Sequence, residues 1–255
     1  MAKRIKAIAF DFEGTIVGTP DEENPEIEIA HYMGFGVVAY VLDLDLPRDV
    51  NSTADMMAFE EAIPHSIGGG DGFNLTEMVK LAGRESEATL VEWLRRLKML
   101  VYNDELDRLI AAGRVGWRPG AQQFFEFVEG LGLDTALGSL TPRKQAERLF
   151  EASGINNRFK AERIVLLEDV KNKKPAPDVY LETARRMDVS PSQQLVIGDS
   201  LNDVKAAVAA GSRVIAMPTV TTPAYTKDLM DNGAMAVFTS WGDQELYDLV
   251  AGLAS

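Results

Sequence analysis

The sequence predicts an α/β fold, in which a doubly wound parallel sheet forms the core and a mainly α-helical domain is inserted after the first strand. In the second half of the chain, short apolar runs alternate with amphipathic helix patterns of about ten residues. Runs that are apolar on both faces are typical of parallel strands covered by helices on both sides. Between about residues 18 and 116, helix patterns follow one another without a clear strand between them, which indicates a separate helical domain.

Five strands, separated by helices, are expected in the sheet domain. Ile5–Phe10 has the same apolar character as the later strands and is expected to join the same sheet. The sheet domain therefore comprises residues 1–17 and 117–255, and the helical domain comprises residues 18–116. The later strands are expected at 133–137, 164–167, 195–197 and 214–217, and the helices between them at 142–153, 178–187 and 201–210.

The helical domain contains two clear helix patterns and two segments of other character. The run VLDLDL at 41–46 alternates between apolar and acidic residues, which is typical of a strand. The segment SIGGGDG at 66–72 is expected to form a flexible lid or a turn rather than a phosphate cradle. The apolar positions of the two helix patterns are Leu75, Met78, Val79 and Ala82, and then Leu90, Leu94, Leu97 and Val101.

Composition restricts the class of protein. The formal net charge of -13 repels phosphate backbones and anionic lipid, so neither nucleic acid nor a membrane is expected as a partner. The absence of cysteine excludes disulfides, thiolate nucleophiles and zinc–thiolate sites. Because no apolar run approaches the roughly 20 residues of a membrane span, a cytoplasmic protein is expected. We expect this protein to be a monomer or homodimer.

Polar side chains follow four of the expected strands at the point where each strand ends. In a parallel sheet these ends meet at one edge, where ligands of α/β proteins bind. The sequence therefore predicts that several carboxylates, hydroxyl groups and one lysine gather at this edge. They are Asp11 and Glu13 after the first strand, Ser139 and Thr141 after the second, Lys174 in the loop after the third, and Asp199, Ser200 and Asp203 after the fourth.

This set of side chains favours phosphoryl transfer. Clustered carboxylates without histidine or cysteine are the oxygen ligands that suit Mg²⁺. A carboxylate can attack phosphorus to give an acyl phosphate, which water then hydrolyses. A hydroxyl group and a lysine can hold the remaining phosphate oxygens and stabilise the charge that develops on them.

Four short motifs resemble those of the haloacid dehalogenase superfamily, in the same order. FDFEGT (10–15) resembles the first motif, Ser139 in ALGSLTP the second, Lys174 in KKPAPDVYL the third, and GDSLND (198–203) the fourth. The segment from KKPAPD to AAVAAG is similar to the phosphoglycolate phosphatase and β-phosphoglucomutase branch. The resemblance implies a Rossmann-like core and identifies the insertion as a helical cap domain.

The resemblance also implies a role for each matching residue. Asp11 would be the nucleophile and a Mg²⁺ ligand, and Glu13 would be the general acid and base and lend its backbone carbonyl to the metal. Ser139 and the neighbouring backbone amide of Leu140 would bind the phosphate, and Lys174 would neutralise it. The remaining roles would be metal ligation by Asp199 and Asp203, and shaping of the phosphate-binding turn by Gly14 and Thr15.

Glu13 departs from the superfamily pattern, in which this residue is usually aspartate. The extra methylene moves the carboxyl group by about 1.5 Å, and a shift of about 1 Å can cost about 100-fold in rate. Either the surrounding backbone is displaced to accommodate Glu13, or the residue marks a weaker catalyst. Retention of a carboxylate nevertheless favours phosphate chemistry, because haloacid dehalogenases carry a non-acidic residue at this position.

The expected activity is Mg²⁺-dependent hydrolysis of a small phosphomonoester through an aspartyl-phosphate, similar to that of phosphoglycolate phosphatase. The alternatives are a phosphomutase similar to β-phosphoglucomutase, a 2-haloacid dehalogenase and a non-catalytic phosphate-binding protein. For Asp203 a purely structural role also stays open, because an acidic residue in the first turn of a helix is stabilised by the helix dipole. Supporting roles are considered for Glu168 and Asp169, and substrate binding for Arg48, Arg84, Arg95, Arg96 and Arg114.

Overall fold

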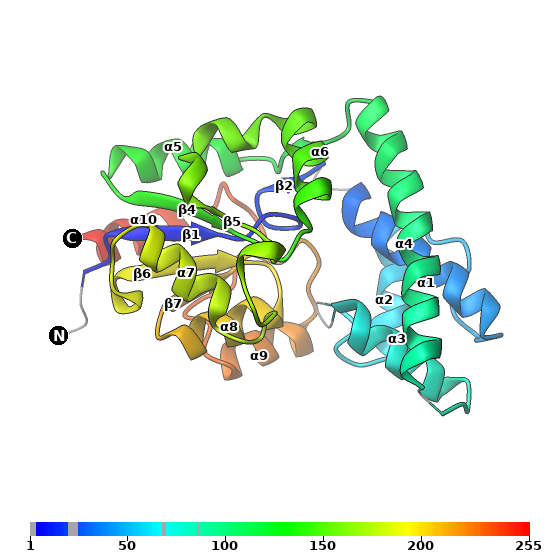
Figure 1. The fold of residues 1–255 in the computed structure, drawn as a ribbon. Coiled ribbons are helices and arrows are strands. Elements are labelled where there is room, and N and C mark those ends of the chain that lie inside the picture. Colours follow the sequence, from blue (N-terminus) through cyan, green and yellow to red (C-terminus); the bar gives the residue numbers. More distant parts are fainter. Residues whose placement is uncertain (1–3, 20–24, 68–69, 86) are drawn as a thin grey trace. The chain divides into compact units, whose positions relative to one another are not determined.

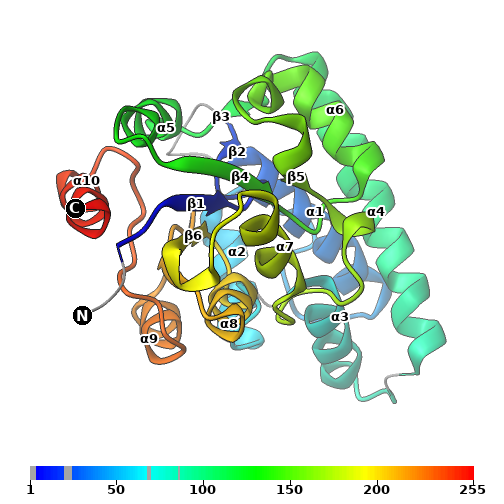
Figure 2. The same cartoon turned by 60° about the vertical axis from the view of Figure 1, so that its left-hand side comes forward.

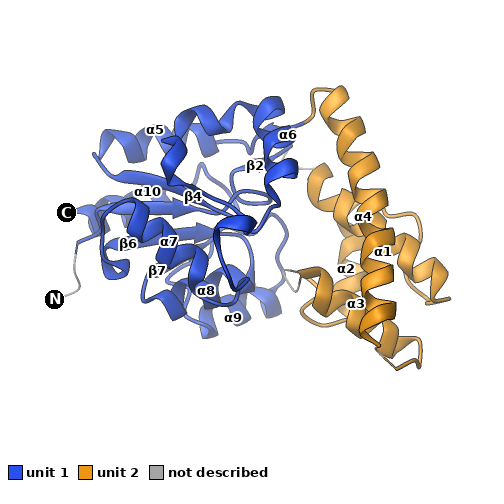
Figure 3. Cartoon of the chain, in the orientation of Figure 1, with its two compact units in different colours: residues 1–22, 115–255 blue, residues 23–114 orange. Residues whose placement is uncertain are grey.

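The computed structural model describes residues 4–19, 25–67, 70–85 and 87–255. The chain forms two compact units, which Figure 3 distinguishes by colour. One unit comprises residues 1–22 and 115–255, and the other comprises residues 23–114.

The first unit is built on a parallel sheet of five strands, so the predicted fold class is confirmed. Strand β1 lies at the centre of the order β5-β4-β1-β6-β7 (Figure 1). Because every pairing is parallel, the carboxyl ends of all five strands point to the same edge. The strands are β1 (Ala7–Phe10), β4 (Asp134–Gly138), β5 (Ile164–Val165), β6 (Gln194–Gly198) and β7 (Arg213–Ala216).

Helices cover both faces of this sheet, as Figure 2 shows. Alternation along β1 directs Phe10 to one face, where its ring packs against Phe124 and Phe125 of α5. On the opposite face, α7 packs over β1, β4 and β5, and α8 over β6 and β7. The helices are α5 (Ala121–Gly130), α6 (Arg143–Ser153), α7 (Asp178–Arg186), α8 (Leu201–Ala210), α9 (Pro223–Asp231) and α10 (Gln244–Ala254), with 3-10 turns at Ile155–Arg158, Ala161–Arg163, Leu167–Asp169 and Pro191–Gln193.

A two-stranded antiparallel ribbon, which sequence patterns did not reveal, encloses the insertion. Strand β2 (Val17–Gly18) pairs with β3 (Gly116–Trp117), so the two ends of the inserted segment are held side by side. Two residues are too few for a periodic pattern, and the pairing joins segments about a hundred residues apart in sequence.

In its described residues the second unit contains four helices, with α1 packed against α4. A Cβ atom on Gly34 of α1 would lie 2.7 Å from the backbone oxygen of Lys98, so a glycine allows the two helices to approach closely. None of the helices in the described part of the chain has both the length and the apolar character needed to cross a membrane. The four helices are α1 (Glu26–Val41), α2 (Thr53–Ala62), α3 (Gly70–Leu81) and α4 (Ala88–Ala111).

Three local expectations are corrected by the structure. Residues 41–46 do not form a strand: α1 runs to Val41, and a turn follows in which leucines are buried and aspartates exposed, without a partner strand. Gly70–Gly72 form the first turn of α3 rather than a flexible loop, whereas residues 68 and 69 of that expected loop lie outside the described residues. The strand expected at 164–167 ends at Val165, where the chain enters a 3-10 turn.

The buried stripe of α4 also differs from the expected one. It contains Leu94, Lys98, Tyr102 and Leu106, spaced four residues apart, whereas Leu97 and other expected positions are only partly buried. A lysine in this stripe was not anticipated, because an unpaired charge is rarely buried. Its carboxylate partner is Asp71 of α3.

Candidate active site

The carboxyl end of β1 leads directly into a tight turn. The Asp11 N–H donates to the carbonyl of Ile197 at 2.8 Å and thereby extends the pairing of β1 with β6. The N–H groups of Ile16 and Val17 both donate to the carbonyl of Phe12, at 3.1 and 3.0 Å, and so close the turn. Within it Gly14 adopts φ +75°, a conformation that favours glycine.

Three carboxylates converge at this edge of the sheet. Asp11, Asp199 and Asp203 each offer one oxygen atom, and these oxygens all lie within 4.8 Å of one another. The turn after β1 holds the Asp199 side chain, because the Thr15 hydroxyl donates to Asp199 Oδ1 at 2.8 Å. A Cβ atom on Gly14 would lie 2.9 Å from Asp199 Oδ2, so only glycine leaves room for this carboxylate.

The Lys174 ammonium group joins two of the three carboxylates. It lies 2.7 Å from Asp11 Oδ1 and 2.5 Å from Asp203 Oδ1, and it also donates to the carbonyl of Gly138 at 3.2 Å. All three charged side chains are buried. Lys174 therefore neutralises part of the negative charge that the sheet edge concentrates.

Burial and charge shift the pKa values of these groups in different directions. Burial and the neighbouring Asp203 carboxylate raise the pKa of Asp11 to about 6, even though Lys174 lowers it. Burial opposes the charged form of Asp203, but Lys174 and the hydrogen bonds of Ser200 and Tyr180 outweigh this effect and lower its pKa. Burial likewise opposes the charge of Lys174, yet the two carboxylates raise its pKa above the ordinary value.

Asp203 is held by hydrogen bonds at both of its oxygens. Oδ1 accepts from the Tyr180 hydroxyl at 2.5 Å in addition to Lys174, and Oδ2 accepts from the Ser200 N–H at 3.1 Å and the Ser200 hydroxyl at 2.5 Å. Ser200 is also the N-cap of α8, and it forms a capping box with Asp203. The same hydrogen bonds therefore cap the helix and hold the carboxylate. The sequence pattern placed Tyr180 only on the apolar face of a helix, and nothing in it indicated this contact.

The end of β4 supplies two buried hydroxyl groups. The Ser139 N–H donates to the carbonyl of Val165 at 3.0 Å, which keeps the chain in register with β5. The hydroxyl oxygens of Ser139 and Thr141 lie 3.0 Å apart, and the Thr141 N–H donates to Ser139 Oγ at 3.2 Å. Leu140 lies between them and is partly buried.

The carboxylate of Glu13 does not belong to the group formed by the three aspartates. It accepts instead from the Thr141 hydroxyl at 2.6 Å and from the Gln145 amide at 2.9 and 3.0 Å. Gln145, in the first turn of α6, was not among the sequence candidates, because a glutamine on a helix surface gives no signal of its partner.

Arg118 is a second residue that sequence reasoning missed. It is buried, and its Nη1 atom donates to the carbonyl oxygens of Gly14 at 2.7 Å, Met217 at 2.9 Å and Thr15 at 3.3 Å. The Trp241 indole N–H also donates to the Thr15 carbonyl, at 3.2 Å. The turn after β1 is therefore fixed from behind by residues that come from distant parts of the chain.

Most of the remaining candidates have structural partners. Glu168 accepts from the N–H of Arg143, and Asp169 pairs with the guanidinium groups of Arg143 and Arg186. Of the five candidate arginines in the helical unit, four form ion pairs with carboxylates of that unit. The pairs are Arg48 with Asp43, Arg95 and Arg96 with Glu92, and Arg114 with Glu26.

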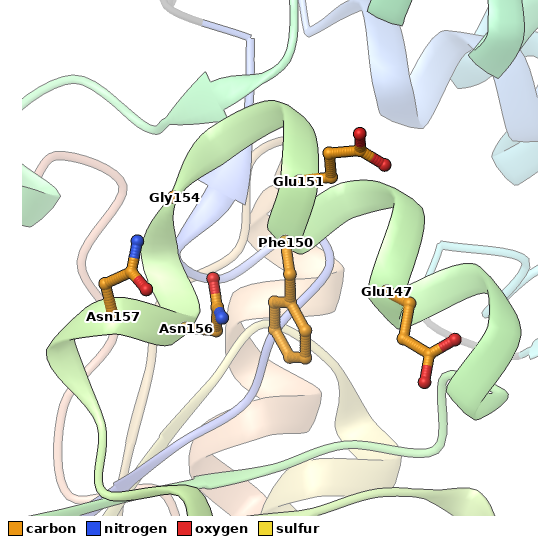
Figure 4. Close-up of a pocket in the computed structure, with 6 residues that line it drawn as sticks. All are labelled: Glu147, Phe150, Glu151, Gly154, Asn156 and Asn157. Carbon is orange, nitrogen blue, oxygen red and sulfur yellow. The ribbon is translucent and has the colours of Figure 1, made fainter.

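A pocket of about 370 Å³ is lined by residues of α6 and of the 3-10 turn that follows it. Figure 4 shows that the carboxylates of Glu147 and Glu151 are directed apart from each other and do not converge on one point. None of its lining residues follows a strand of the sheet, so this pocket is not assigned to the reaction. The lining residues are Glu147, Phe150, Glu151, Gly154, Asn156 and Asn157.

The three aspartates fit a hard divalent cation. They provide only oxygen atoms, which Mg²⁺ prefers over nitrogen or sulfur. Oxygens that share one ion at about 2.1 Å lie at most about 4.2 Å apart, so the three oxygens, which lie within 4.8 Å of one another, need at most a small approach to bind one ion. A cation would also offset the repulsion between carboxylates that burial intensifies.

Comparison with known proteins agrees with this arrangement. The model of the haloacid dehalogenase-like hydrolase family matches residues 5–211, and the chain therefore belongs to this family. The predicted superfamily is thus confirmed.

Individual relatives are similar at modest identity. A phosphoglycolate phosphatase of Shigella boydii is 29% identical over 225 residues, which are 81% of this chain and 79% of that protein. A bifunctional riboflavin kinase/FMN phosphatase of Arabidopsis thaliana is 32% identical over 151 residues, which are 56% of this chain but only 39% of that protein. The crystal structure of a haloacid dehalogenase-like protein of unknown function from Agrobacterium tumefaciens has a TM-score of 0.71 at 22% identity, covering 98% of this chain and 100% of that one.

Proposed function

We propose that this protein is a Mg²⁺-dependent phosphatase that hydrolyses a small phosphomonoester through an aspartyl-phosphate on Asp11. The observation that carries the proposal is the buried contact of Asp11 with Lys174, within a group of three carboxylates at the sheet edge. A nucleophilic carboxylate, a fixed cation and an oxygen-only metal site are together what phosphoryl transfer requires. The phosphoglycolate phosphatase relative supports the same class of reaction.

The reaction proceeds in two steps on the residues of the first unit. A carboxylate oxygen of Asp11 attacks phosphorus, the bond from phosphorus to the substrate oxygen breaks, and Glu13 gives a proton to the departing alkoxide. Water then attacks the phosphorus of the aspartyl-phosphate while Glu13 takes a proton from it. This step releases inorganic phosphate and restores Asp11.

The other residues bind and orient the phosphoryl group. The Lys174 ammonium compensates negative charge on its oxygens, and the Ser139 hydroxyl and the Leu140 N–H donate hydrogen bonds to them. Gly14 and Thr15 keep the turn in place and hold the Asp199 carboxylate.

We assign the metal to Asp11, Asp199 and the backbone carbonyl of Glu13. When bound, Mg²⁺ supplies a positive charge that neutralises the phosphate and lowers the repulsion against the carboxylate nucleophile. Asp203 acts through water, because both of its oxygens already accept hydrogen bonds from protein groups.

The substrate that we propose is a small phosphorylated metabolite in the cytoplasm, such as a phosphoglycolate-like monoester. The phosphatase relatives support this class, and the net charge of -13 disfavours nucleic acid and membranes as partners. We propose that residues 18–116 act as a cap domain that selects the leaving group, in a protein that is a monomer or homodimer.

The function is tested by turnover with p-nitrophenyl phosphate and a panel of phosphorylated metabolites, with and without Mg²⁺. Release of phosphate should require Mg²⁺, and Asp11→Asn should lower kcat by at least about a thousandfold, since the nucleophile is lost. Asp248→Asn, at an exposed position of α10, is the matched control and should leave turnover unchanged. Binding of Mg²⁺ and phosphate without any turnover would show instead a non-catalytic binding protein.

A further inference from the structure

The carboxylate of Glu13 is bound between the end of β4 and the first turn of α6. Thr141 contributes its hydroxyl group at 2.6 Å from Oε1, and the Gln145 amide lies 2.9 Å from Oε1 and 3.0 Å from Oε2. These bonds reach across 128 and 132 positions of sequence, so they exist only in the folded protein. Thr141 is buried and Gln145 is half-buried, which limits competition from water.

The direction of these hydrogen bonds follows from the protons that are available. Once Glu13 has given up its proton, the ionised carboxylate can only accept, so in that state the single hydroxyl proton of Thr141 is committed to Oε1. Before a phosphate takes up the Ser139 proton, the contact of 3.0 Å between the two hydroxyl groups must then be donated by Ser139. A continuous chain therefore runs from Ser139 through Thr141 to Glu13, and Gln145 donates to the far end of it.

This arrangement accounts for a glutamate at position 13. An aspartate would withdraw the carboxyl group by about 1.5 Å along the side chain. Contacts of 2.6 to 3.0 Å would then exceed the usual limit of about 3.2 Å for a hydrogen bond. Neither Thr141 nor Gln145 could hold the shorter side chain in the same way.

We propose that Thr141 and Gln145 are positioning residues that orient the proton-transferring carboxylate of Glu13 and keep it apart from the three aspartates. The inference rests on the proposed function, because it assigns the orientation of the general acid of that reaction. Two hydrogen bonds from one amide restrict rotation about the last bond of Glu13, and the hydroxyl group fixes how far the side chain extends. A longer acid is thereby given a defined position without displacement of the backbone.

The experiment is a double-mutant cycle between Gln145 and Glu13, read out as kcat and KM for p-nitrophenyl phosphate. Gln145→Ala should lower kcat by about 10- to 100-fold, the range expected for hydrogen bonds to a charged group, with KM changed less than about twofold. Glu13→Asp should also lower kcat. In the Glu13→Asp background, Gln145→Ala should have no further effect, because the shorter carboxylate is already out of reach.

Two further variants separate orientation from packing. Gln145→Glu keeps the size of the side chain but replaces the donor amide with a like charge, and it should lower kcat at least as much as Gln145→Ala. Thr141→Ser keeps the hydroxyl group, and its kcat should stay within a few fold of the wild-type value. Thr141→Val lacks the hydroxyl group, and its kcat should fall. The matched control is Gln122→Ala, which removes an exposed glutamine–glutamate pair on α5 and should leave kcat unchanged.

The possible outcomes distinguish this inference from the proposed function. Losses that multiply in the Glu13→Asp, Gln145→Ala double variant would overturn the positioning role, and so would a rise of kcat in Glu13→Asp alone. In both cases an active wild type would leave the phosphatase assignment intact. A wild type without turnover on any phosphomonoester would overturn the proposed function, and the positioning role with it.

Discussion

At the scale of single residues, the site depends on how closely the turn after β1 approaches the loop after β6. Gly14 has φ +75°, and the space that a Cβ atom would need is taken by the Asp199 carboxylate. The Thr15 hydroxyl then fixes the same carboxylate from the other side. One small residue and one hydroxyl group thereby place a candidate metal ligand.

Gly14→Ala should both destabilise the protein and displace Asp199. The backbone conformation alone costs about 1 to 2 kcal/mol for a residue with a Cβ atom, and the contact of 2.9 Å adds a clash with Asp199. We expect weaker Mg²⁺ binding in a calorimetric titration. Gly132→Ala is the control, since that glycine has φ +69° but open space around it, and it should lose stability without loss of Mg²⁺ affinity. Equal Mg²⁺ affinity in wild type and Gly14→Ala would contradict the assignment of Asp199.

At the scale of elements, helix α4 shows how a buried stripe accommodates a charge. Lys98 is 0% exposed, and its ammonium group lies 2.8 Å from Asp71 on α3 and 2.5 Å from His31 on α1. The rings of Phe35 and Tyr102 lie 5.1 and 5.3 Å from it, within the range of cation–π attraction. The partners from three helices offset the cost of desolvation, so the lysine joins the helices of this unit.

The Asp71 carboxylate should make the stability of the protein sensitive to acid. Burial opposes its ionised form, but Lys98, with His31 and Arg95, lowers its pKa below the ordinary 3.8. Because the folded state binds the proton more weakly than the unfolded chain, the stabilisation is complete above pH 3.8 and is lost as the pH falls below it. The free energy of unfolding in urea should be measured from pH 3 to pH 7 for the wild type and for Asp71→Asn. The difference between the two free energies should be largest near pH 7. Asp43→Asn, which removes an exposed ion pair, should show little difference at any pH.

At the scale of the whole molecule, the parallel sheet collects groups from strands that are distant in sequence. The trio of carboxylates joins the end of β1 to the end of β6 and the first turn of α8, and Lys174 from the loop after β5 closes the group. A cation bound by these carboxylates binds the folded state and not the unfolded chain, which lacks the site. The metal site and the stability of the fold are therefore linked.

Mg²⁺ should raise the melting temperature. At a free concentration about 100 times the Kd, binding contributes about 2.7 kcal/mol, which corresponds to a rise of about 5 to 10 °C for a protein of this size. Addition of EDTA should reverse the rise in a differential scanning fluorimetry experiment. Asp199→Asn should reduce it, while Asp169→Asn, whose carboxylate pairs with two arginines, should retain it. Identical melting curves in Mg²⁺ and in EDTA would contradict the metal site.

Much of the sheet and of the site could be predicted because the information is local. The apolar run of each strand, the helix at 201–210 and the polar residues directly after the strands lie within single short segments. The strand expected at 41–46 was wrong because an alternating pattern also arises in a turn whose leucines are buried, and only a partner strand separates the two cases. Gly70 and Gly72 were misjudged because the sequence did not reveal that Asp71, which stands between them in the first turn of α3, pairs with Lys98 of α4.

The sequence by itself determined the fold class, the family and which side chains stand at the edge of the sheet, because these follow from short periodic patterns and motifs. Only the tertiary structure decided how those side chains are paired: Glu13 with Gln145, Asp203 with Tyr180, and the turn after β1 with Arg118. It also decided the pairing of Lys98 with Asp71 in the helical unit. The physical reason is that a buried polar group must find a partner, and the identity of that partner depends on contacts between residues far apart in the chain.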